Sequence, residues 1–209
     1  MKSFYLTERQ ADILSEVGNI GAGHAAMALS TLLQSQIKMS VTSARLCGFE
    51  QIAEVVGGAE SVIAAVFLRM AGDLEGNMMF ILSLESARQL IFQLLPRGEV
   101  EDFTELELSA LGEVGNILGG SYLSALSTLT SLRLYQSVPA VAVDMAGAVL
   151  DIGLLMTGEV SDSAILIDTS ISQGEANIDG HFFLLPDPDA AMPLLRALGD
   201  HAEPNDASE

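Results

Sequence analysis

The sequence predicts an α+β fold built by tandem duplication, with one β-sheet merged from both halves and two long helices side by side on one face. The first observation is a repeated segment, because residues 16–20 read EVGNI and the same letters return at residues 113–117. The flanks repeat in the same register, since ALSTL at residues 28–32 returns at 125–129. The offset of about 97 residues is nearly half of the 209-residue chain, which indicates a duplicated unit. Two such units favour pseudo-two-fold symmetry around a shared core.

The first half begins with a long helix over residues 7–34, since apolar residues recur there at steps of three and four. Thr7 is suited to cap its N-terminus, and Gln10 is placed to complete a capping box. Residues 36–46 alternate between apolar and polar, which predicts a strand. The remaining elements of this half are a short helix over 49–56 that ends at Gly57 and Gly58, a hairpin of strands 61–71 and 76–84 that turns near Asp73, and a helix over 85–95 that Pro96 ends.

The second half repeats this order of elements. Thr104 caps a helix that runs to about Thr130, with Glu107 placed for a capping box, and a strand over 133–143 contains Pro139. The other predicted elements are a helix over 146–156, a hairpin of strands 163–171 and 176–185, and a helix over 187–198. We expect a single domain over residues 1–200, made of repeats 7–96 and 104–199, followed by an acidic, disordered tail over 200–209.

Composition and charge exclude several classes of protein. Hydrophobic residues make up 49% of the chain, so we expect it to fold around a core. No apolar run reaches the ~18 residues that a membrane span needs, and residues 1–5 do not begin a signal peptide. Cys47 is the only cysteine, which excludes an internal disulfide and a cysteine-based zinc cluster, and these features together favour the cytoplasm. The net charge of −19 disfavours binding to nucleic acid and insertion into a membrane. Two explanations of the charge remain, which are attraction of a partner with a basic surface and general solubility.

Each long helix carries an acid or a hydroxyl, then Glu four residues later, then Asn three residues after the Glu. The two sets are Asp12, Glu16 and Asn19 in the first helix, and Ser109, Glu113 and Asn116 in the second. Steps of three and four place all members of a set on one face of the helix. An isolated set of this kind would be explained by a solvated helix face, but its duplication favours a functional site.

Both helices also contain several glycines, each of which costs about 0.8–1.0 kcal/mol relative to alanine inside a helix. They are Gly18, Gly21 and Gly23 in the first copy, and Gly115, Gly119 and Gly120 in the second. Two interpretations explain them: the helices pack too closely to admit side chains, or another molecule approaches the helix surface. A local rule that is broken in both copies indicates a functional site.

The residue types in the two sets limit the chemistry. Neither Glu nor Asn is a strong nucleophile here, and the sequence shows no Ser–His–Asp pattern. A Glu can pair with a cation on a partner, and an Asn amide can orient a water molecule. Such positioning assists hydrolysis of a phosphoryl group, which requires little covalent chemistry of the protein. The segment GNIGAG at residues 18–23 is not a phosphate-binding loop, because it lies within a helix.

The doubled motif resembles the pattern of the CheC family of chemotaxis phosphatases, which is related to CheX and FliY and, in fold, to the flagellar switch protein FliM. That pattern is Asp or Ser, three residues, Glu, two residues, Asn, and then Pro further along the chain. The second copy here is complete, with Ser109, Glu113, Asn116 and Pro139. The first copy has Thr42 where Pro is expected. If one site dominates, the second is therefore the better candidate.

The resemblance implies a substrate, a mechanism and partners. The substrate would be the aspartyl phosphate of the response regulator CheY, and the Mg²⁺ would belong to the regulator, so that this chain needs no cofactor of its own. Glu16 or Glu113 would pair with a lysine of the regulator, while Asn19 or Asn116 would orient the attacking water. The resemblance also implies binding to the receptor deamidase CheD, with Asp144 as the candidate contact.

Several of these residues are compatible with another role. Asp144 would equally cap the helix that follows it. The main rival to a phosphatase is a non-enzymatic adaptor that binds the deamidase or the flagellar switch, because FliM-like relatives keep the fold without the catalytic residues. Retention of both Glu–Asn pairs argues against the adaptor. His24 is expected at the surface, since Ser121 replaces it in the other repeat, and Cys47 is expected to be a small buried residue.

Overall fold

Seven strands form one antiparallel sheet in the computed structural model, which describes residues 6–48, 51–95, 103–157, 163–173 and 176–199. The strands are β1 (Lys38–Gly48), β2 (Val62–Gly72), β3 (Gly76–Ser83), β4 (Leu134–Gln136), β5 (Ala140–Met145), β6 (Ser163–Gln173) and β7 (Ala176–Pro186). Their order is β1-β6-β7-β3-β2-β4, with β5 also paired to β2. The order reads the same from either edge when the two repeats are exchanged, which confirms the merged, pseudo-symmetric sheet.

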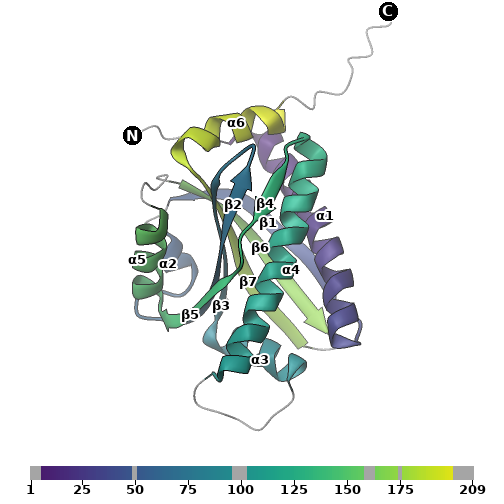
Figure 1. The fold of residues 1–209 in the computed structure, drawn as a ribbon, viewed down its shortest axis with the longest axis vertical. Helices are drawn as coiled ribbons and strands as arrows, with labels where there is room; N and C mark the ends of the chain where they lie inside the picture. Colours follow the sequence, from purple (N-terminus) through teal and green to yellow (C-terminus); the bar gives the residue numbers. More distant parts are fainter. Residues whose placement is uncertain (1–5, 49–50, 96–102, 158–162, 174–175, 200–209) are drawn as a thin grey trace, which may run out of the picture.

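The helices lie on both faces of this sheet (Figure 1). They are α1 (Glu8–Leu33), α2 (Ile52–Val55), α3 (Leu84–Leu94), α4 (Glu105–Thr130), α5 (Ala146–Thr157) and α6 (Pro188–Gly199). The long helices α1 and α4 lie side by side over one face, as the sequence predicts, and a large apolar core fills the space beneath them. A smaller apolar cluster lies on the other face, under α2 and α5.

Both long helices begin and end in the same way. Thr7 and Thr104 are N-caps whose side chains accept from the backbone of Gln10 and Glu107, and both capping boxes are complete. The C-cap residues Gln34 and Ser131 are left-handed, with φ of 49° and 58°. The predicted starts of both helices are therefore confirmed, and the duplication extends to their end structures.

One predicted strand is wrong in detail. Residues 133–143 do not form a continuous strand, because β4 and β5 are separated at residues 137–139, although both pair with β2. Proline has no backbone N–H and is tolerated only at the edge of a sheet or at an irregularity, and Pro139 lies in this gap. Ser137 bridges the gap, since its N–H donates to Arg69 O and its Oγ accepts from Arg69 N, both at 2.9 Å.

The short helix begins at Ile52 rather than at residue 49, and residues 49–50 lie outside the described part of the chain. Pro96 and the tail over 200–209 also lie outside it. Gly57 and Gly58 follow this helix with φ of +105° each, a conformation that suits glycine. Within the described residues, no helix has both the length and the apolar content to cross a membrane.

Close packing explains most of the helix glycines. A Cβ on Gly21 of α1 would lie 2.5 Å from Tyr122 Cδ1 of α4, and a Cβ on Gly115 would lie 2.5 Å from Val66 Cγ1 of the sheet. Gly18 also meets sheet side chains, at 3.0 Å from Val41 Cγ2. Gly23 differs, because a Cβ there would meet no atom within 4 Å. The first interpretation is therefore correct for the inward glycines, while Gly23 faces open space.

Candidate functional site

The complete set of motif residues borders one groove. Helix α4 presents Ser109, Glu113 and Asn116 toward the gap between β4 and β5, where Pro139 lies. The groove has a volume of about 630 Å³ and is lined by Leu108, Ser109, Gly112, Glu113, Asn116, Gln136, Ser137, Val138, Pro139 and Val141. Ser109 and Glu113 are exposed and Asn116 is half-buried. The structure thus brings together the four residues of the second copy that the sequence singled out.

A glycine lets the wall of the groove come close to α4. A Cβ on Gly112 would lie 3.3 Å from Val141 Cγ2 and 3.7 Å from Pro139 Cγ. The neighbouring Val138 leaves 86% of its surface exposed at the rim. The second site therefore combines one carboxylate and one amide with an apolar wall, a combination that suits docking of a folded partner more than a small polar ligand.

The amide of Asn116 is held by a second amide. Gln136, on β4, donates from Nε2 to the Asn116 backbone carbonyl at 2.9 Å and to Asn116 Oδ1 at 2.7 Å. The bond to Oδ1 lies at the short end of the N–H···O range and the bond to the carbonyl is of ordinary length, so the Asn116 side chain is fixed from one side. The Nδ2 group and one lone pair of Oδ1 remain available.

The first copy lies on α1 and is more exposed. Asp12, Glu16 and Asn19 are all exposed. Asn19 Oδ1 accepts one hydrogen bond, from the backbone N–H of Val41 on β1, at 3.3 Å. The register of β1 against β6 shifts between Val41 and Ser43, so Thr42 occupies a bulge where the second copy has Pro139.

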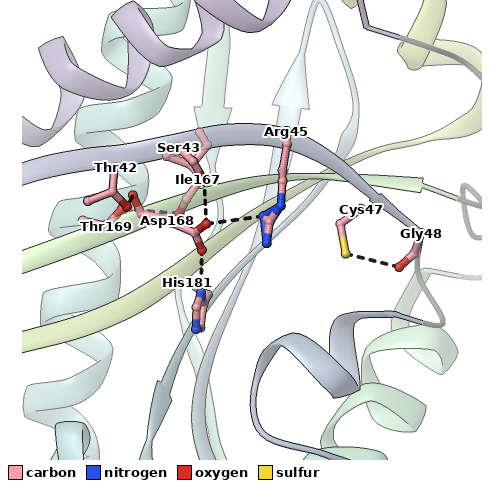
Figure 2. Close-up of polar contacts among 9 residues, drawn as sticks. All are labelled: Thr42, Ser43, Arg45, Cys47, Gly48, Ile167, Asp168, Thr169 and His181. Atoms are coloured by element: carbon pink, nitrogen blue, oxygen red, sulfur yellow. Dashed lines mark hydrogen bonds and ion pairs between the residues drawn. The ribbon is translucent and has the colours of Figure 1, made fainter.

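A polar cluster on the carboxylate of Asp168 fixes the strand behind the first site (Figure 2). Asp168, on β6, accepts from Ser43 Oγ at 2.6 Å and from Arg45 at 3.4 Å, and its Oδ1 lies 2.7 Å from His181 Nδ1 of β7. Thr42 Oγ1 donates to the Asp168 carbonyl at 3.3 Å. His181 also packs beside Phe183. Through its contact with Asp168, His181 helps to hold β1 and its bulge in register with β6 and β7.

Other residues named from the sequence lie apart from the groove. Asp144 is exposed at the end of β5 and does not line the groove. Its Oδ1 accepts from the N–H of Met145, the residue before α5, at 2.7 Å, so this bond does not cap the first turn of the helix.

His24 is exposed and Cys47 is buried, as predicted, and burial raises the pKa of the Cys47 thiol. In the described part of the chain, no three His, Cys, Asp or Glu side chains gather in a metal-binding arrangement.

Sequence reasoning missed Gln136 and the apolar wall of the second site. The signal was present as a difference between the repeats. Met39 and Ala22 stand in the first copy where Gln136 and Gly119 stand in the second, at the same offset as the motif. A comparison of the two copies position by position would have marked both residues.

Known sequences identify the family. A family model described as CheC-like family matches residues 10–41 and 106–143, which contain both Glu–Asn pairs. "CheY-P phosphatase CheC" from Bacillus subtilis (strain 168) is 47% identical over 200 residues, which cover 93% of this chain and 96% of that protein. "Putative CheY-P phosphatase CheC1" from Halobacterium salinarum is 22% identical over 196 residues, with 91% and 96% covered.

Solved structures share the fold. FliY from Thermotoga maritima matches with a TM-score of 0.74 at 21% identity, over 94% of this chain and 98% of that one. CheX from Borrelia burgdorferi, in a complex with CheY, BeF3 and Mg²⁺, matches with a TM-score of 0.50 at 17% identity, over 82% and 96% of the chains. The duplicated fold, the paired motifs and the extent of identity to the Bacillus subtilis protein agree: the chain belongs to the CheC-like family.

Proposed function

We propose that this chain is a phosphatase that hydrolyses the aspartyl phosphate of a CheY-type response regulator. The observation that carries the proposal is the second site, where Glu113 and Asn116 border an open groove beside Pro139. The proposal is supported by the Bacillus subtilis relative, a CheY-P phosphatase that is 47% identical to this chain. The chain is accordingly a hydrolase that acts on a response-regulator phosphate. We expect it to act in the cytoplasm.

In this mechanism the two polar residues have separate tasks. The exposed carboxylate of Glu113 pairs with a lysine of the regulator and fixes the docked orientation. The amide of Asn116 then reaches the phosphoryl group and orients a water molecule in line with the scissile bond. The water oxygen bonds to phosphorus, the bond to the regulator's aspartate breaks, and inorganic phosphate leaves. A Mg²⁺ ion bound by the regulator would neutralise the phosphoryl charge, and the proposal then requires no metal site of this chain.

The first copy performs the same task, but its Asn is held less firmly by neighbouring residues. Glu16 and Asn19 take the roles of the Glu and Asn, and Asp12 and Ser109 support the two sets in equivalent positions. Asn19 is held by one longer hydrogen bond and is exposed. We therefore assign most of the activity to the second site.

A protein of the same fold has been seen bound to such a regulator. The Borrelia burgdorferi structure contains CheX together with CheY, BeF3 and Mg²⁺. This supports a mode of action in which a protein of this fold docks on a folded CheY-type regulator in the presence of Mg²⁺. The apolar rim of the groove, with Val138 exposed, fits such a partner.

The receptor deamidase CheD is proposed as a second partner, with Asp144 as its contact. Asp144 is exposed and its single described hydrogen bond is to the adjacent residue, which leaves the carboxylate accessible. A pull-down with the deamidase tests this, because Asp144→Asn is expected to reduce the retained protein. Equal retention of the variant and the wild type would remove Asp144 from the interface.

Phosphate release from a phosphorylated CheY-type regulator tests the main proposal. The double variant Asn19→Ala, Asn116→Ala is expected to lose nearly all activity while its thermal unfolding stays close to that of the wild type. Asn177→Ala is a matched control, since Asn177 is an exposed Asn on β7, outside both sites. Unchanged release by the double variant would remove Asn19 and Asn116 from the reaction, whereas no release by the wild type above the regulator's own rate would favour a non-enzymatic adaptor.

A further inference from the structure

Gln136 is a polar residue that lines the second site and that the motif does not include. Its side chain extends from β4 to α4 and donates to two oxygens of the same residue, the carbonyl and Oδ1 of Asn116. It also lines the groove, where Asn116 borders the space open to a partner. A side chain with two bonds to one candidate catalytic residue is in a position to control that residue's orientation.

The two bonds fix which end of the Asn116 amide faces the groove. A backbone carbonyl can only accept, so the atom of Gln136 that lies 2.9 Å from the Asn116 carbonyl must be the donor Nε2. The same nitrogen lies 2.7 Å from the Asn116 amide, so the Asn116 atom it meets must be the acceptor Oδ1. The Nδ2 group of Asn116, with both hydrogens, is therefore left for a ligand.

We propose that Gln136 is a positioning residue, which turns the Asn116 amide so that Nδ2 faces the phosphoryl group and its attacking water. This rests on the proposed phosphatase function and specifies how its second site is oriented. Without Gln136, the Asn116 side chain has two amide orientations, of which one presents the wrong atom to the phosphoryl oxygens. An oxygen presented to phosphoryl oxygens would repel them instead of donating a hydrogen bond.

The surroundings of Gln136 favour this role over a purely structural one. Gln136 Oε1 is buried and has no hydrogen-bond partner among the described residues. An unpaired buried acceptor costs about 1–3 kcal/mol, so an apolar side chain would serve packing better. The first repeat has such a side chain, Met39, at the equivalent position. Stability alone therefore does not account for a glutamine here.

Gly119 provides the space that Gln136 occupies. A Cβ at Gly119 would lie 2.8 Å from Gln136 Oε1 and 2.6 Å from Leu68 Cδ1, closer than real Cβ contacts allow. The first repeat has Ala22 at this position, together with Met39 in place of the glutamine. The glycine and the glutamine thus occur together in the second copy and are both replaced in the first.

The experiment measures kcat and KM for phosphate release from a phosphorylated CheY-type regulator, in an Asn19→Ala background that reports the second site alone. Gln136→Met is expected to lower kcat about ten-fold with KM within about two-fold, because orientation of the attacking group is lost while docking is kept. Gln136→Glu is expected to lower kcat further, since its carboxylate accepts from Nδ2 and turns the amide the wrong way. Gln173→Met is the matched control: it removes an equally short bond, from Gln173 Nε2 to Ser35 Oγ at 2.7 Å, remote from the site.

A second readout separates this proposal from the phosphatase assignment. The NMR order parameter of the Asn116 side-chain NH₂ is expected to fall in Gln136→Met and to stay unchanged in Gln173→Met. An unchanged order parameter and an unchanged kcat would overturn the positioning role. If the wild type itself releases no phosphate, the proposed function fails, and the order parameter alone then decides whether Gln136 orients Asn116.

Discussion

The two Glu–Asn sites occupy equivalent places in a pseudo-symmetric fold, yet their asparagines are held differently. Asn116 is half-buried and bonded at 2.7 Å by a side-chain amide, whereas Asn19 is exposed and bonded at 3.3 Å by the backbone N–H of Val41. The helices carry the same Glu–Asn motif, so the difference arises in the strands beside them and in Gly119, which is Ala22 in the first copy. Both copies keep the Glu and the Asn, while the residues that hydrogen-bond the Asn differ between them.

A second contrast lies between the helices. Tyr122 of α4 packs against Phe182, and its hydroxyl lies 2.9 Å from Thr169 Oγ1, whereas the first repeat has Ala25 at the equivalent position. Burial raises the pKa of Tyr122 to about 12, and the hydrogen bond between Tyr122 and Thr169 offsets part of that rise. The second copy therefore contributes a buried polar contact to the core that the first does not.

The largest expected effect on stability comes from this tyrosine at alkaline pH. Because its pKa is higher in the folded state, its contribution is complete below about pH 10 and is lost as pH rises towards 12. The free energy of unfolding should therefore fall by about 2–3 kcal/mol over this range in the wild type relative to Tyr122→Phe. Urea unfolding at several pH values measures it. If the free energy of unfolding falls equally with pH in the wild type and in Tyr122→Phe, the raised pKa does not belong to Tyr122.

The contact between the two helices gives the next effect. Gly21→Ala would place a Cβ 2.5 Å from Tyr122 Cδ1 and 3.0 Å from its Cα, so the helices must separate. We expect a loss of about 1–3 kcal/mol in the free energy of unfolding. If Tyr122 is the cause, the loss should be smaller when Gly21→Ala is combined with Tyr122→Ala. Equal losses in both backgrounds would show that the helix contact is not the reason for the glycine.

Introducing the second copy's glutamine and glycine into the first copy should bring the activity of the first site closer to that of the second. In an Asn116→Ala background, Met39→Gln with Ala22→Gly is expected to raise the remaining phosphate release several-fold, because Asn19 then gains a side-chain amide donor. Thr42→Pro alone should leave this release nearly unchanged, since Thr42 occupies a bulge at the sheet edge that accepts proline. A large gain from Thr42→Pro would mean that the missing proline, and not the missing glutamine, weakens the first site.

The smallest expected effect concerns the open glycine. Gly23→Ala meets no atom within 4 Å, so it should stabilise the protein by about 0.5–1 kcal/mol through helix propensity. Gly23 follows Asn19 by one helix turn on the same face, so we also expect lower activity of the first site in an Asn116→Ala background. Higher stability with unchanged activity would show that no partner approaches α1 at this point.

Much of the fold was predictable because its signals are local or repeated. Thr7 and Thr104 carry capping boxes within four residues, and the repeated EVGNI segment implied the symmetric sheet. The gap between β4 and β5 was harder to predict from the sequence, since it depends on how Ser137 pairs with Arg69 across the sheet. A proline in an edge strand does not by itself decide between a continuous strand and an interruption.

The candidate site was predictable only in part, for a similar reason. The Glu–Asn spacing places both groups on one helix face, which follows from helix geometry alone. The bond between Gln136 and Asn116 joins residues 20 positions apart, and it requires the space above Gly119. Such a contact depends on how the strand packs against the helix, which no local pattern encodes.

Separate replacement of the two asparagines tests most directly whether the second site carries most of the activity. Phosphate release from a phosphorylated CheY-type regulator is measured for Asn19→Ala and for Asn116→Ala, with thermal unfolding as a check on folding. Asn116→Ala is expected to lose most of the activity, whereas Asn19→Ala is expected to retain the larger part of it. Equal losses, or a larger loss in Asn19→Ala, would contradict it.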